Sequence, residues 1–212
     1  MKRSFLKCLI ASCFILLAES CANSYFYTVW KGPDIRERRY HKILVAGIMP
    51  DADSMLRIKL ETSIAERLRL NGYVAAAASE EYGMHGLADL GEEETFVRLC
   101  SSGTDAVVIF SLLDRNRESD GSPARAANYP SSYYYSRIWH YKDIEAETAT
   151  TQTELTEAEK YYWECSIFDL STLEVQFVVQ SRVSLKGSLS NVSEDFGNRI
   201  GNLLSKRKIL HP

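Results

Sequence analysis

The stretch that decides the fold is KILVAGIMPDADSMLRIKLETSIAERLRLNGYVAAAAS, residues 42–79. Its first apolar run, Ile43 to Met49, lacks polar alternation and therefore predicts a strand covered on both faces. Apolar residues then recur at every fourth position over residues 54–70, which predicts an amphipathic helix. An Asn-Gly pair marks the end of that helix. Residues 73–79 form a second apolar run and predict another buried strand.

The alternation of strands and helices continues beyond this stretch. Residues 80–91 predict a loop. Three glutamates, which suit the positive N-terminal end of a helix, open a predicted helix over residues 92–103. The apolar face of this helix is expected to consist of Phe96, Val97, Leu99 and Cys100. Residues 105–113 form a third apolar run, so the order strand-helix-strand-helix-strand predicts a parallel sheet with right-handed connections.

Two further strands, residues 161–170 and 173–185, are joined by a short turn and predict an antiparallel hairpin. In the second of them, apolar residues alternate with Glu174, Gln176 and Gln180, which predicts one face in contact with water. A last apolar stripe predicts a C-terminal helix and consists of Val192, Phe196, Ile200, Leu203 and Leu204.

These elements together predict the fold class and the domain organisation. We expect an α/β fold, with a single three-layer domain over residues 41–207. Its mixed five-stranded sheet combines three parallel strands with the antiparallel hairpin, and about three helices pack on it. An irregular, tyrosine-rich insertion over residues 115–159 interrupts the domain.

The N-terminal segment predicts export. Lys2, Arg3 and Lys7 precede an apolar run of about eleven residues, which is shorter than the roughly 20 residues that span a hydrocarbon core. This pattern is typical of a secretory signal peptide, here residues 1–20. In one interpretation, the chain is cleaved before Cys21, which is acylated at its sulfur and becomes the mature N-terminus. In the other, cleavage at a small-x-small site releases a soluble periplasmic protein.

The lipid-anchored interpretation predicts a location. Two or three acyl chains, palmitate among them, anchor a protein stably because each buried methylene contributes about 0.8 kcal/mol. Ala22, rather than Asp, follows the cysteine, which is similar to the sorting pattern of Gram-negative outer-membrane lipoproteins. We therefore expect an outer-membrane lipoprotein that faces the periplasm, with residues 21–40 as a tether between the lipid and the domain.

Composition and charge exclude some classes of partner. The chain has 212 residues, of which 45% are hydrophobic and 25% charged, as in ordinary globular proteins. Without the four charged residues of the signal peptide it keeps 22 basic and 27 acidic residues, a formal charge of −5. A mildly acidic domain has no general affinity for nucleic acid. Cys100 and Cys165 are interpreted as small buried hydrophobic residues, and a disulfide between them is the alternative.

The sequence contains no recognised catalytic or metal-binding motif. Glycine-rich phosphate loops, nucleophile elbows and metal-ligand histidine spacings are all missing, so we expect no enzyme activity, no metal and no cofactor. Asp51, Asp53, Glu80 and Glu81 follow the first two strands, at the edge where open α/β sheets bind ligands. They predict either helix caps and loop residues or a small-ligand-binding or hydrolytic site that uses these carboxylates.

The insertion contains the candidate partner-binding surface. Aromatic residues with arginines nearby are typical of protein interfaces, and flat rings also suit stacking on sugars. A self-packed tyrosine-rich loop is the alternative. The candidate residues are Tyr129, Tyr133, Tyr134, Tyr135, Trp139 and Tyr141.

Several segments together resemble a group of uncharacterised bacterial envelope lipoproteins. They are the export signal with its cysteine, the stretch quoted above, DAVVIFSLLD at 105–114 and WECSIFDLSTLEVQFVVQSRV at 163–183. More distantly, the chain is similar to the N-terminal α/β domain of TolB and to related periplasmic lipoproteins. In the group, an arginine and an acidic residue one turn apart open the first helix, and Arg57 and Glu61 match that pattern. The resemblance implies a fold and a location, but no catalytic residues, because the group has no established enzyme activity.

We expect Arg57 and Glu61 to form an exposed ion pair, since they lie four residues apart on one helix. Such a pair contributes about 0.3–0.5 kcal/mol to stability.

The sequence as a whole predicts a non-enzymatic binding or accessory module, presented from a membrane anchor to an envelope protein or a glycan. The carboxylate site at the sheet edge is the alternative. A third interpretation is an assembly subunit that self-associates through an edge strand or the aromatic loop.

Overall fold

The computed structural model describes most of the domain expected from the sequence. The described residues are 25–32, 39–49, 54–85, 87, 92–115, 160–184, 189–206 and 209.

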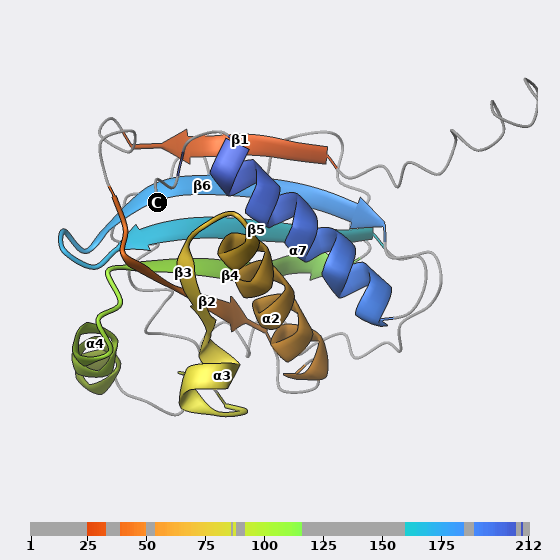
Figure 1. The fold of residues 1–212 in the computed structure, drawn as a ribbon. Helices are drawn as coiled ribbons and strands as arrows, with labels where there is room; N and C mark the ends of the chain where they lie inside the picture. The colour runs from red at the N-terminus through yellow and green to blue at the C-terminus, as the bar shows by residue number, and fades with distance from the viewer. Residues whose placement is uncertain are drawn as a thin grey trace, which may run out of the picture.

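A single mixed sheet organises these residues (Figure 1). Its strands are β1 (Tyr25–Lys31), β2 (Lys42–Ile48), β3 (Val74–Ala77), β4 (Ala106–Arg115), β5 (Lys160–Asp169) and β6 (Glu174–Ser184). The helices are α2 (Ser54–Leu70), α3 (Ala78–Tyr82), α4 (Glu92–Ser101) and α7 (Leu189–Lys206). The strand order across the sheet is β1-β6-β5-β4-β2-β3.

The pairing of the strands confirms the predicted α/β class. β2 runs parallel to both β3 and β4, whereas β4, β5 and β6 pair in antiparallel fashion. The three parallel strands and the hairpin therefore lie where the apolar runs predict them. The prediction of residues 80–91 as a loop is wrong at its start, because α3 follows β3 directly.

The sheet has one strand more than the five that we predicted. β1 lies within residues 21–40, the segment expected to be a tether, and pairs with β6 so that Tyr25 is opposite Arg182. The strand has the sequence YFYTVWK, and its aromatic and β-branched residues favour extended structure. Its position just after the export signal, and not its composition, suggested a tether.

The handedness of the crossovers places helices on both faces of the sheet. The chain moves from β2 outward to β3 through α2, and then back past β2 to β4 through α4. Because connections between parallel strands are right-handed as a rule, reversing the direction of travel is expected to put the two helices on opposite faces. The residues of α2 and Leu99 of α4 do lie in separate core clusters. The predicted three-layer arrangement follows from this rule.

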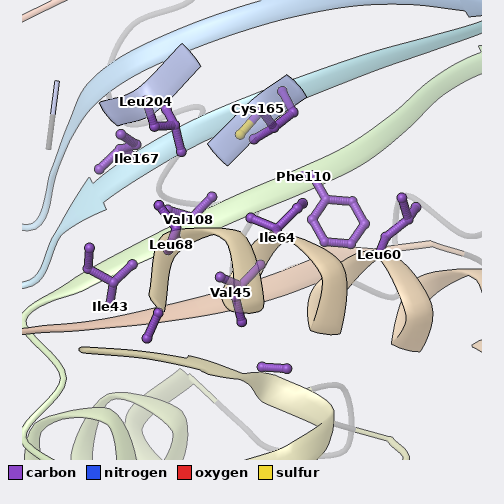
Figure 2. Close-up of a cluster of buried hydrophobic side chains, with 14 of the residues drawn as sticks. Ile43, Val45, Leu60, Ile64, Leu68, Val108, Phe110, Cys165, Ile167 and Leu204 are labelled. Carbon is purple, nitrogen blue, oxygen red and sulfur yellow. The ribbon is translucent and has the colours of Figure 1, made fainter. Parts of the chain in front are cut away.

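The larger part of the core lies between the sheet and the helix pair α2 and α7 (Figure 2). Alternate residues of β2, β4 and β5 point toward this layer, and α2 contributes the stripe that its four-residue spacing predicts. Phe196, Ile200 and Leu204 of α7 complete the layer, as the C-terminal stripe predicts. Side chains labelled in Figure 2 include Ile43, Val45, Leu60, Ile64, Leu68, Val108, Phe110, Cys165, Ile167 and Leu204.

The other face of the sheet is also buried, which corrects the prediction of a wet face on residues 173–185. Gln176 and Gln180 are only 3% and 1% exposed. Gln180 donates a hydrogen bond from Nε2 to Oε2 of Glu164, its register partner on β5, at 2.9 Å. A polar side chain is tolerated in a buried layer when its polar atoms are bonded. Alternating polar residues therefore indicated here a cross-strand polar pair, and not contact with water.

α4 buries a narrower stripe than its sequence predicts. Leu99 is fully buried beside the sheet and Thr95 is 2% exposed, but Val97 is 57% exposed. Cys100 is exposed as well, whereas Cys165 is buried, and both cysteines are free thiols. Burial, and secondarily the neighbouring charge of Glu164, raises the pKa of Cys165 to about 12, so this thiol stays protonated.

α2 and α7 pack in parallel and unusually closely. A Cβ atom at Gly197 would lie 2.5 Å from Cβ of Ser63 and 2.8 Å from its backbone carbonyl carbon. Further along the pair, Asn71 Nδ2 donates to Oγ of Ser205 at 2.8 Å. Glycine at 197 therefore sets the distance between the two helices that cover the core.

We predict that Gly197→Ala destabilises the domain by about 1–3 kcal/mol, the usual cost of forcing an extra methyl group into a packed interior. Urea unfolding followed by circular dichroism measures the change. Glu194→Ala, at an exposed position of the same helix, is the matched control and is expected to change stability by less than about 0.5 kcal/mol. Equal stability of the two variants would contradict the close-packing account.

Candidate functional site at the end of strand β2

Several residues predicted to be functional lie outside the described residues. They are Cys21, Asp51, Asp53, Tyr129, Tyr133, Tyr134, Tyr135, Trp139 and Tyr141.

Glu80 and Glu81 are described, and they diverge instead of converging on a common point. Glu80 pairs with Arg69 of α2, with Nη2 and Oε2 2.5 Å apart. Glu81 pairs with Lys42 at the start of β2, with Nζ and Oε1 2.7 Å apart. Both carboxylates therefore tie α3 to its neighbours.

The polar cluster at this edge is instead built around Arg57 and Glu61 of α2. Their side chains are 7% and 0% exposed, and Nη1 of Arg57 lies 2.9 Å from Oε1 of Glu61. The expectation of an exposed ion pair is therefore wrong. The two residues continue the buried stripe of α2 by spacings of four and three residues, through Ile64 and Leu68. That spacing was a signal in the sequence that both charged side chains face inward.

Glu61 joins its own helix, α2, to β2 and α3. Its Oε1 atom also accepts the backbone N–H of Gly47 in β2 at 2.9 Å. Its Oε2 atom accepts the backbone N–H of Ser79 in α3, again at 2.9 Å. Arg57 donates its remaining terminal nitrogen, Nη2, to the carbonyl oxygen of Met84, beyond α3. Each carboxylate oxygen of Glu61 thus accepts a main-chain N–H, one from the last residues of β2 and one from just after β3.

Gly47 makes this approach of helix and strand possible. A Cβ atom at this position would lie 2.5 Å from the ring of Phe110 and 2.7 Å from Cγ of Arg57. With no side chain at 47, the aromatic ring and the aliphatic part of the arginine both pack against the strand. The single glycine within the apolar run of residues 43–49 was therefore a second signal for the site.

A small cavity lies next to the Arg57–Glu61 pair. Its volume is about 30 Å³, which has room for two or three water molecules at roughly 10–15 Å³ each. Pockets that hold metabolites are about ten times larger, at roughly 300–1,000 Å³. Its lining is mostly apolar and consists of Ala46, Gly47, Ile48, Arg57, Glu61, Ala78, His85, Leu87, Leu99, Val107 and Ile109.

The geometry of the described residues thus favours a structural role for the pair. A carboxylate that accepts three hydrogen bonds is held in one position and has little capacity left for a ligand. Breaking a buried pair by removing one partner costs about 3–5 kcal/mol, because the other charge stays buried without compensation. This is about ten times the contribution expected for the pair on an exposed helix surface.

We predict that Glu61→Ala lowers the free energy of unfolding by about 3–5 kcal/mol, or prevents folding of the domain. The control is Glu94→Ala in α4, which removes an i,i+4 pair with Arg98 whose side chains are 55% and 49% exposed. Loss of the control pair is expected to cost at most about 0.5 kcal/mol. Urea unfolding of both variants tests the difference, and similar midpoints would argue against a supporting role for Glu61.

Arg69 and Glu80 have a second role at the outer edge of the sheet. β3 is the last strand, so the groups on its outer side have no neighbouring strand in the described sheet. Arg69 donates from Nε to the carbonyl oxygen of Ala75 at 2.8 Å, and Oε2 of Glu80 accepts the N–H of Ala77 at 3.4 Å. We call this arrangement the Arg69–Glu80 edge cap. It occupies backbone groups that would otherwise serve as a template for another strand.

We predict that Arg69→Ala increases self-association, because the carbonyl group of Ala75 becomes available for pairing with another chain. Light scattering at two protein concentrations should show a mean mass that rises with concentration more steeply than for the parent protein. Arg98→Ala is the matched control, since it also removes an arginine from an ion pair but leaves both sheet edges intact. Identical scattering by the two variants would exclude the protective role.

The described residues were also compared with the requirements of a metal site and of a membrane-spanning helix. Within the described ranges, no group of three or more His, Cys, Asp or Glu side chains is placed so that it could hold a metal ion. In the same part of the chain, no helix is long and apolar enough to cross a membrane.

Comparison with known proteins gives only remote likenesses. No protein-family model matches the chain, and no curated protein is significantly similar to it. Among solved structures, it is similar to the PelC dodecamer from Paraburkholderia phytofirmans, at 12% identity and a TM-score of 0.47, with 90% of this chain and 100% of that chain covered. It is also similar to lipoprotein GNA1162 from Neisseria meningitidis, at 14% identity and a TM-score of 0.39, with 78% and 96% covered. With TM-scores below 0.5, these likenesses assign neither a family nor a function.

Proposed function

We propose that this chain is an exported cell-envelope lipoprotein, acylated at Cys21, whose α/β domain is a non-enzymatic binding or accessory module. The observation that carries the proposal is the N-terminal sequence. A basic start and a short apolar run lead to Ala18 and Ser20, small residues three and one positions before a cysteine, Cys21. Acyl chains on that cysteine would hold the domain at a membrane.

The location that we propose is the outer membrane, with the domain facing the periplasm. Ala22 supports this choice, because a residue other than Asp after the cysteine is typical of Gram-negative lipoproteins that are sorted to the outer membrane. The aromatic residues at 129–141 are the proposed contact surface for an envelope protein or a glycan.

The described part of the sheet edge argues against the alternative, a small-ligand-binding or hydrolytic site at this edge. Glu61, Glu80 and Glu81 are each engaged by an arginine, a lysine or main-chain N–H groups. The adjacent cavity, at about 30 Å³, is small for a substrate. The alternative used Asp51, Asp53, Glu80 and Glu81. Asp51 and Asp53 lie outside the described residues, and Glu80 and Glu81 would have to leave their partners and meet around a larger pocket.

We predict that the mature protein, isolated from its native host, has the mass of a chain beginning at Cys21 plus two or three acyl chains. Cys21→Ala should abolish the added mass and release the protein from the membrane fraction. Intact-protein mass spectrometry of both forms is the measurement, and Cys100→Ala is the control because it removes an exposed cysteine elsewhere. An unmodified parent chain cleaved at another residue would refute the proposal and favour a soluble periplasmic protein.

A further inference from the structure

The chain between the proposed lipid site and the sheet is very short. β1 begins at Tyr25, four residues after Cys21. Four residues span at most about 14 Å even when fully extended, at 3.3–3.6 Å per residue. The tether of residues 21–40 predicted from the sequence would have reached about 70 Å by the same measure. The first strand therefore shortens the reach of the anchor about fivefold.

The register of the sheet shows which part of the domain lies at that anchor. Tyr25 pairs with Arg182 near the end of β6, which pairs in turn with Tyr162 near the start of β5. Arg115 at the end of β4 pairs with Tyr161. These strand termini share one end of the sheet, which we call the anchor end (Figure 1, where β1 begins and β4 and β6 end).

The directions of α2 and α7 agree with this assignment of the anchor end. α2 follows the end of β2, which runs parallel to β4, so α2 starts at the anchor end. α7 lies parallel to α2, because Gly197 and Ser205 approach Ser63 and Asn71 in the same order. Ser190, exposed in the first turn of α7, is therefore at the anchor end. Thr172, exposed in the turn between β5 and β6, is at the opposite end of the sheet.

The residue types at the anchor end suit a membrane interface. The last register positions of β1, β4, β5 and β6 contain three tyrosines and three basic residues, together with the acidic residue Asp114. Tyrosine is enriched at membrane–water interfaces, and basic residues are attracted to an anionic lipid surface. The tyrosines and basic residues are Tyr25, Tyr161, Tyr162, Arg115, Lys160 and Arg182.

From the short connection and this composition, we infer that the domain stands end-on against the lipid bilayer. The anchor end touches the surface, and the turn at residues 170–173 points away from it. The partner of the anchor end is the lipid headgroup layer itself. This inference rests on the proposed acylation of Cys21, and it adds an orientation that acylation alone does not determine.

Energy transfer from the protein to labelled lipids tests the orientation. Acylated protein carrying Cys100→Ser and either Ser190→Cys or Thr172→Cys is labelled with a donor dye; the buried thiol of Cys165 is protected in the folded domain. Each form is reconstituted into phosphatidylethanolamine–phosphatidylglycerol vesicles that contain an acceptor dye on the headgroups. Transfer from position 190 should exceed transfer from position 172 at least about twofold, since roughly 30 Å of strand separates the two ends.

A longer connection supplies the control. Insertion of twenty Gly and Ser residues between Ser24 and Tyr25 keeps the acylation signal but should reduce the difference between the two positions. Equal transfer from both positions in vesicle-bound, acylated protein would overturn the orientation and leave the lipid anchor standing. Stronger transfer from position 172 would also overturn it. Failure of the parent protein to carry acyl chains, seen by mass, would refute the anchor and the orientation together.

Discussion

The carboxylate of Glu61 is the constraint on which the arrangement of the parallel half of the sheet depends. Glu61 belongs to α2, yet its carboxylate accepts hydrogen bonds from the backbone of β2, from the backbone of α3 and from the guanidinium group of Arg57. Nonpolar contacts hold α2 on the sheet but permit sliding, because dispersion forces have little directionality. Three charge-assisted hydrogen bonds of 2.9 Å are directional, and they define the position of the helix along the strand.

The fold was largely predictable because its parallel half is built from uninterrupted apolar runs separated by one clear helix. The strands at 42–48 and 106–115 follow directly from those runs, whereas the antiparallel strands at 160–169 and 174–184 follow from the predicted hairpin. The burial of Gln180 and the burial of Glu61 were both missed, because residue type alone does not show whether a side chain is buried. Gln180 and Glu61 are polar residues, and each is buried because another element supplies its bonding partner. β1 was missed because its position just after the export signal suggested a tether, although its aromatic and β-branched residues favour extended structure.

The candidate site was only partly predictable. The sequence indicated the correct edge, since the polar cluster does follow the ends of β2 and β3. Of the carboxylates that it suggested, Glu80 and Glu81 lie in the helix α3 and pair with Arg69 and Lys42, whereas Asp51 and Asp53 lie outside the described residues. The inward direction of Glu61 could have been read from its spacing to Ile64 and Leu68, and the role of Gly47 from its isolation among larger apolar residues. The backbone N–H groups of Gly47 and Ser79 donate to Glu61, and no pattern of residue types predicts such main-chain donors.

The packing of α7 on α2 has a consequence for the order in which the chain folds. Contacts such as that between Asn71 and Ser205 join residues 134 positions apart, so the main core closes only when the last helix is present. Contacts of such long range slow folding, because the entropy of closing the intervening loop is lost before they form. For a chain that is exported in the manner proposed, α7 crosses the membrane after every other described helix and strand. The fold would thus delay its own completion until the whole described domain has been translocated, which keeps the chain in the extended form that a secretion channel accepts.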